Sequence, residues 1–138
     1  MSAYVEIAVD IRDESALLEA LNQMGFPRGS LIVEPGHRLE GYEGARRTQT
    51  ADITIPRRLV GTMSNDIGFH RTEKGFELVI SEYDQSYSRS RYRHGFANTL
   101  RHHYGVAAAT KQLQCKGYRV EQTKQPDGAV VLQAVRWR

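Results

Sequence analysis

A segment rich in arginine, tyrosine and histidine contains the side chains best suited to bind a ligand. It reads SYSRSRYRHGFANTLRHHYG and covers residues 86–105. Arginine pairs with phosphate or carboxylate groups, and aromatic rings stack on bases. We therefore expect either a surface for RNA, DNA or an acidic protein, or the ordinary solvated face of an amphipathic helix, over residues 87–104. The candidate binding residues are Arg89, Arg91, Arg93, Arg101, His102 and Tyr104, together with Trp137 near the C-terminus.

Three histidines lie in this segment, and their spacing argues against a metal site. His94 and His102 are eight residues apart, and His103 follows His102 directly. Two histidines on one helix bind a metal best when they are four residues apart, and the sequence has no HExxH or paired-cysteine motif. We therefore expect no metal ion. Because GxxxxGK[ST] and GxGxxG are also absent, we expect no nucleotide cofactor.

Two acidic residues and one cysteine are the other candidates for chemistry. Glu82 and Asp84 end an expected strand, where a carboxylate can act as a general base or cap the following helix. Cys115 is expected in the last turn of a helix, where the dipole disfavours the thiolate. No second catalytic group lies at a defined spacing from them. We expect a protein without enzyme activity, with catalysis at Glu82 and Asp84 as the alternative.

The charges are distributed unevenly along the 138 residues. Residues 87–138 hold ten Lys and Arg against two acids, whereas residues 1–86 hold nine against fourteen. This asymmetry indicates either an acidic partner or solvated helices. The sequence has one cysteine, no run of about 18 apolar residues and no signal peptide, which predicts a cytoplasmic protein outside the membrane.

Hydrophobic patterns predict the first half of the fold. Residues 3–11 alternate as a half-buried strand, and Leu17, Leu21 and Met24 then form the apolar stripe of a helix. Residues 28–50 are polar and interrupted by Pro35, Gly36, Gly41 and Gly44, which predicts a long loop or a mobile insertion, with a mobile hairpin as the other interpretation.

The second half is predicted as two hairpins around a long helix. The hairpins cover residues 66–83 and 118–137, and the helix covers residues 86–116, where Gly105 could break it. The whole chain, residues 1–138, is expected to be a single α+β domain. It has an antiparallel sheet of about five to seven strands with two helices on one face. A ferredoxin-like sandwich is the alternative.

Two segments resemble a domain-of-unknown-function family. They are NDIGFHRTEKGFELVISEYD (65–84) and KGYRVEQTKQPDGAVVLQAVRWR (116–138). The family includes hypothetical plastid reading frames of red algae, their cyanobacterial counterparts, and bacterial and viral relatives. The second segment contains its closing pattern, G-[FY]-x-V…DG…RW. The opening strand and helix are similar to the family start, whereas residues 27–64 have no match.

The resemblance implies a fold more than a function. Family members are often encoded near AAA-type ATPases, which implies a small accessory or adaptor protein that acts through protein–protein contacts in a larger assembly. Such a protein could have an AAA-type ATPase as its partner. A nucleic-acid-binding protein is the alternative function. The family members also make the plastid stroma or a viral origin alternatives to the cytoplasm.

Overall fold

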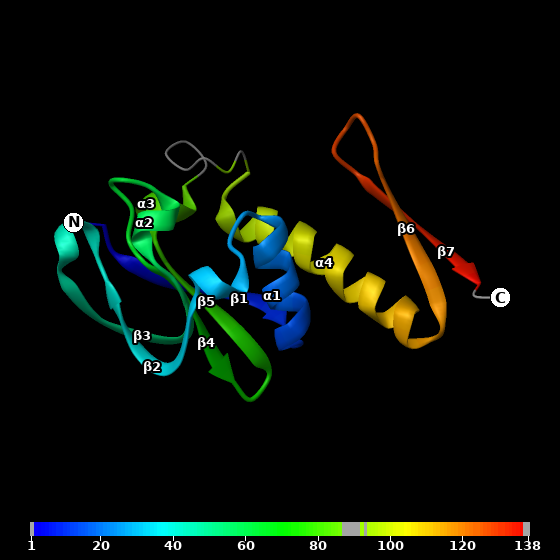
Figure 1. Ribbon diagram of the computed structural model, residues 1–138. Helices are drawn as coiled ribbons and strands as arrows, with labels where there is room; N and C mark the ends of the chain where they lie inside the picture. The colour runs from blue at the N-terminus through cyan, green and yellow to red at the C-terminus, as the bar shows by residue number, and fades with distance from the viewer. Residues whose placement is uncertain (1, 87–91, 93, 137–138) are drawn as a thin grey trace.

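The computed structural model describes residues 2–86, 92 and 94–136, which build a head and a projecting arm (Figure 1). The strands are β1 (Tyr4–Ile11), β2 (Ile32–Glu40), β3 (Arg46–Ile55), β4 (Ile67–Thr72), β5 (Gly75–Ser81), β6 (Tyr118–Lys124) and β7 (Val130–Arg136). The α-helices are α1 (Glu14–Gln23), α2 (Arg57–Val60), α3 (Glu82–Gln85) and α4 (Phe96–Cys115). We call residues 101–136 the arm. They comprise most of α4 and the β6–β7 ribbon.

Five strands form the sheet of the head. Their order is β1-β5-β4-β3-β2, and every pairing is antiparallel. The predicted hairpin over residues 66–83 is present as β4 and β5, and Leu78 of β5 pairs with Ile7 on one side and Phe69 on the other. The α+β class is therefore confirmed. In the ferredoxin-like alternative, the strand after the second long helix returns to the main sheet, whereas here the strand after α4 lies in the separate two-stranded sheet of β6 and β7.

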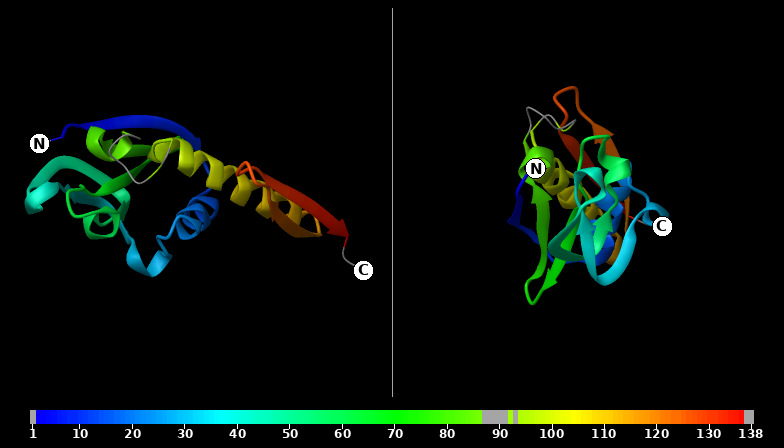
Figure 2. Two further views of the ribbon diagram at one scale, coloured as in Figure 1. Left: turned by 90° about the horizontal axis from the view of Figure 1, so that it is seen from above. Right: turned by 90° about the vertical axis from the view of Figure 1, so that its left-hand side faces the viewer.

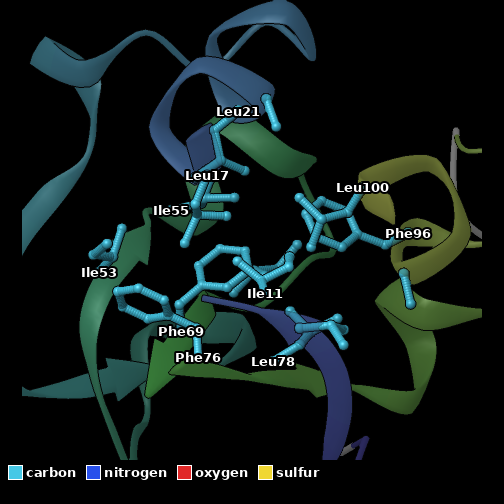
Figure 3. Close-up of a cluster of buried hydrophobic side chains, with 14 of the residues drawn as sticks. Ile11, Leu17, Leu21, Ile53, Ile55, Phe69, Phe76, Leu78, Phe96 and Leu100 are labelled. Atoms are coloured by element: carbon cyan, nitrogen blue, oxygen red, sulfur yellow. The ribbon is translucent and has the colours of Figure 1, made fainter. Parts of the chain in front are cut away.

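One face of this sheet carries the core, and both long helices cover it (Figure 3). Leu17 and Leu21 of α1 and Phe96 and Leu100 of α4 are fully buried there. The sheet contributes Ile11, Ile53, Ile55, Phe69, Phe76 and Leu78. Burial of each such side chain stabilises the fold by roughly 1.5–3 kcal/mol. The prediction of two helices on one face is confirmed.

Residues 28–50 contain β2 and the first half of β3, which agrees with the hairpin interpretation and not with a long loop. β2 and β3 pair antiparallel with irregular register, and Leu39 and Ala51 pack with Val79 on the second face of the sheet. Gly68 permits this approach, because a Cβ at that position would lie 2.5 Å from the Ala51 side chain. Pro35 and Gly36 lie where the register shifts, and an edge strand tolerates them there, whereas Gly41 and Gly44 lie in the turn between β2 and β3.

α4 begins at Phe96, later than the start expected at Ser86. The side chain of Gln85, at the end of α3, accepts a hydrogen bond from the backbone N–H of Ala97 at 3.1 Å. This contact provides a partner for the first turn of α4. Gly95 precedes the helix with a φ of 85°, and a Cβ there would lie 3.0 Å from the carbonyl oxygen of Gln85. The hydrogen bond from Ala97 to Gln85 and the positive φ of Gly95 therefore set the start of α4.

The last hairpin forms as predicted but stands apart from the main sheet. β6 and β7 pair from Tyr118 with Arg136 to Lys124 with Val130, in a separate two-stranded sheet. α4 runs unbroken through Gly105 and carries this ribbon away from the head (Figure 2). None of the described helices is both long and apolar enough to cross a membrane.

Candidate functional site

The arm has no buried core of its own. The buried hydrophobic side chains of the described residues all lie between Val9 and Leu100, and no residue from 101 to 136 is buried. The arm nevertheless carries half-buried apolar side chains, namely Val106, Leu113, Val120, Val130, Leu132 and Val135. Val131 is 49% exposed. A two-stranded ribbon is marginal without a third strand or a packed helix, and here α4 supplies only part of that cover.

A groove of about 1080 Å³ lies between the arm and the head. Its floor is α4, with Val106 and Ala107, and one wall is α1, with Glu19. The other wall is the ribbon, with Lys124 and Val130. α1 and the ribbon both contact α4, but α1 belongs to the head and the ribbon to the arm, so that the two walls belong to different parts of the molecule (Figure 1). A hollow of this size can hold a peptide segment.

The lining of the groove is mainly basic. Its ionisable side chains are Glu19, His94, His102, His103, Lys111 and Lys124. Burial is the main cause that lowers the pKa of His103, and the neighbouring His102 and Lys124 lower it further. Across residues 2–86, 92 and 94–136, no group of three or more His, Cys, Asp and Glu side chains is arranged to hold a metal ion. Basic groups around an apolar floor favour an acidic, partly apolar ligand.

Lys111 fixes the position of α1 against α4. Its Nζ donates to Oδ2 of Asp13 at 2.6 Å and to Oγ of Ser15 at 2.7 Å. Oδ1 of Asp13 accepts from the backbone N–H of Ala16 and so caps α1. The hydrogen bond from Lys111 is the main cause that lowers the pKa of Asp13 to about 2, and the same contact raises the pKa of Lys111.

This ion pair predicts acid sensitivity. The folded pKa of Asp13 lies near 2 and its ordinary value is 3.8, so ionised Asp13 stabilises the fold above that value. The contribution is lost as the pH falls through about 2. In Lys111→Met we expect the pKa of Asp13 to rise toward 3.8. The variant should therefore lose less stability than the parent as the pH falls from 3.8 to about 2. A carboxyl-carbon NMR titration measures the pKa directly, and an unchanged value would contradict this assignment.

Arg101, one of the predicted binding residues, joins α4 to the sheet. Its Nη2 donates to the carbonyl oxygen of Ala8 in β1 at 3.1 Å, and its Nη1 donates to Oδ1 of Asn98 at 3.1 Å. The first contact spans 93 positions of sequence. The guanidinium therefore positions α4 on the head.

Tyr104 and His102, two further predicted residues, face different surroundings. The hydroxyl of Tyr104 accepts hydrogen bonds from the backbone N–H groups of Arg12 and Asp13 at 3.2 and 3.1 Å. His102 is exposed and lines the groove. The described candidates are thus not gathered on one face, and only His102 belongs to the groove. The remaining candidates lie outside the described residues: Arg89, Arg91, Arg93 and Trp137.

Asp84, considered from the sequence as a general base or cap, is a buried hydrogen-bond acceptor. Its Oδ2 accepts from the backbone N–H of Asn65 at 3.0 Å, from Nδ2 of Asn65 at 3.2 Å and from Oγ of Ser81 at 2.7 Å. All three residues are buried. The carboxylate therefore joins the loop before β4 to the end of β5. Glu82, the other candidate acid, is exposed.

Asp66, which sequence reasoning missed, secures the curled β2–β3 hairpin. Its Oδ2 accepts from the backbone N–H of Glu40 at 2.8 Å, and its Oδ1 accepts from the backbone N–H of Arg57 at 2.7 Å. Tyr4 donates its hydroxyl to the Asp66 carbonyl oxygen at 2.7 Å. Burial is the main cause that raises the pKa of this carboxyl group. The only signal in the sequence was an acid directly before an apolar strand.

Comparison with known proteins places the chain in a family. The family model "Protein of unknown function (DUF1257)" matches residues 20–132, which include α4, most of the residues that line the groove and most of the ribbon. The chain therefore belongs to this family. No curated protein and no solved structure matches it.

Proposed function

We propose that this protein is a small accessory protein that acts through protein–protein contacts in a larger assembly, with the arm as its contact surface. The observation that carries this proposal is that no described residue from 101 to 136 is buried, although the arm contains many apolar side chains. Apolar surface that a chain leaves uncovered is typical of interaction sites. A partner that covers the arm would complete the burial that the chain alone does not provide.

The groove suggests the chemistry of the partner. Its apolar floor at Val106 and Ala107, with Lys124 and His102 at its sides, suits an acidic and partly apolar segment of another protein. An AAA-type ATPase is one candidate partner, on the strength of the family resemblance alone. The cytoplasm is the proposed compartment, because the thiol of Cys115 is exposed and free.

A charge introduced into the groove should abolish partner capture. Ala107→Glu would place a carboxylate on the groove floor, where it opposes an acidic segment. Ala107 is only half-buried and glutamate is a good helix former, so the fold is retained. We expect recovery of the partner by tagged full-length protein to fall at least about tenfold, the equivalent of about 1.4 kcal/mol. Mass spectrometry of the co-purified chains measures this.

Gln112→Glu is the matched control. It adds the same charge to the same helix, but Gln112 does not line the groove. We expect this variant to recover the partner as the parent does. Equal recovery by both variants would reject the groove as the contact surface. Recovery of RNA or DNA in place of a protein, with binding that falls steeply as salt rises, would favour the alternative function.

A further inference from the structure

The outer edge of β7 lacks the features that normally protect the edge of a sheet. Natural edge strands carry charges, prolines or bulges that prevent pairing with another chain. β2 has Glu34 and Pro35, and β1 has Asp10 at a bulge. Residues 130–135 of β7 read VVLQAV and contain no charge, proline or glycine. In the part of the chain that the structure describes, β7 pairs with β6 alone.

The turn between β6 and β7 determines which backbone groups face this edge. The N–H of Gln125 donates to the carbonyl oxygen of Ala129 at 2.7 Å, which sets the first bonded pair of the ribbon. Bonded and non-bonded pairs then alternate along an antiparallel ladder. Alternate residues from 131 onward therefore bond to β6. The N–H and C=O groups of Val130, Leu132 and Ala134 face outward.

We propose that β7 pairs with β7 of a second copy of this chain, antiparallel about a two-fold axis at Leu132. The result is a four-stranded sheet in which β6 lies at each edge. An isologous pairing of this kind requires a self-complementary strand. With the axis at Leu132, this residue lies opposite its own copy, and Val130 lies opposite Ala134 of the second copy. Both pairs are apolar, and all three outward-facing residues find backbone partners.

Charge selects this register over its neighbours. With the axis at Leu132, the exposed Arg136 reaches the turn of the second copy, where Asp127 lies. The same contact forms twice because the axis relates the two chains. Moving the axis to Ala134 would instead place Arg136 opposite Leu132 of the second copy. Moving it to Val130 would leave most of the edge unpaired. The uncharged strand and its charged ends therefore indicate the same pairing.

A disulfide trap tests the pairing. Bonded antiparallel pairs have Cα atoms about 5.5 Å apart, within the usual disulfide range. In a Cys115→Ser background, Leu132→Cys should form a covalent dimer under mild oxidation. Gln122→Cys is the matched control, because Gln122 pairs with Leu132 across the ribbon but lies on the opposite edge. We expect no covalent dimer from the control.

A second variant preserves the test if the cysteine disturbs the ribbon. Ala134→Pro removes one outward N–H and no bond to β6, so it should shift the parent from dimer to monomer in sedimentation equilibrium. Gln122→Pro, on the other edge, should leave the dimer intact. A parent that stays monomeric at high concentration, or equal cross-linking at both cysteines, would overturn the pairing.

The pairing and the proposed function fail separately. Loss of the dimer in Ala134→Pro with partner recovery intact would support the pairing and show that the partner does not need it. A monomeric parent that still recovers its partner would reject the pairing and leave the proposed function standing. A dimeric parent that recovers no protein partner would support the pairing and reject the proposed function.

Discussion

Leu78→Ala is expected to lower the free energy of unfolding by about 2–5 kcal/mol, whereas Leu132→Ala should lower it by less than about 1 kcal/mol. Both residues are leucines on β-strands. Leu78 is fully buried between β1 and β4, and Leu132 is only half-buried in the ribbon. The difference in cost follows from the amount of apolar surface that each side chain removes from water. Urea denaturation of dilute protein measures both values.

The dilute condition matters, because another copy or a partner would bury Leu132 further. At concentrations where the chain assembles, we expect the cost of Leu132→Ala to grow while that of Leu78→Ala stays constant. Similar costs for the two variants in dilute solution would mean that the arm is packed as tightly as the head.

Asp84→Ala should also destabilise the head strongly, by about 2–4 kcal/mol. The substitution removes an acceptor that three buried groups share, and it leaves the N–H of Asn65 and the hydroxyl of Ser81 without this partner. Each buried donor left unsatisfied costs about 1–3 kcal/mol. Thermal and chemical denaturation both report the change.

Glu82→Ala is the control for this prediction. Glu82 lies two residues before Asp84 and is exposed, so its removal should change stability by about 0.5 kcal/mol or less. If Asp84→Ala melted like the parent, its carboxylate would not hold the loop before β4.

Local patterns were sufficient for elements whose own residues determine them. The alternation over residues 3–11 predicted β1, and the apolar stripe of Leu17 and Leu21 predicted α1. The turn at Gln125–Gly128 predicted the last hairpin. In each case the periodicity of one short segment matches the face that it buries.

Contacts between distant residues determine what the sequence did not reveal. The β2–β3 hairpin depends on the Asp66 carboxylate, which binds the backbone of Glu40 from 26 positions away. The start of α4 depends on Gln85, which lies 12 positions before the N–H that it accepts from. Such partners leave no periodic signal in the segment that they stabilise.

The candidate site was predicted only in part for the same reason. His102 was found because histidine can bind ligands and it lies on the expected helix. Arg101 and Tyr104 have the right chemistry for a ligand, but their bonds to the β1–α1 region link α4 to the head. Prediction of the groove would have required the position of α1 relative to the ribbon. That position depends on the contact between Lys111 and Asp13, which are 98 positions apart.

Amide hydrogen exchange, measured on the dilute chain and on its purified assembly, tests most directly whether the arm is completed by another chain. In the dilute chain we expect residues 101–136 to exchange faster than β4 and β5, because few buried contacts protect them. In the assembly, exchange in the arm should slow at least about tenfold, the equivalent of about 1.4 kcal/mol of added protection. Exchange in β4 and β5 should not change. An arm as protected as β5 in the dilute chain, or equally exchangeable in both states, would contradict the account.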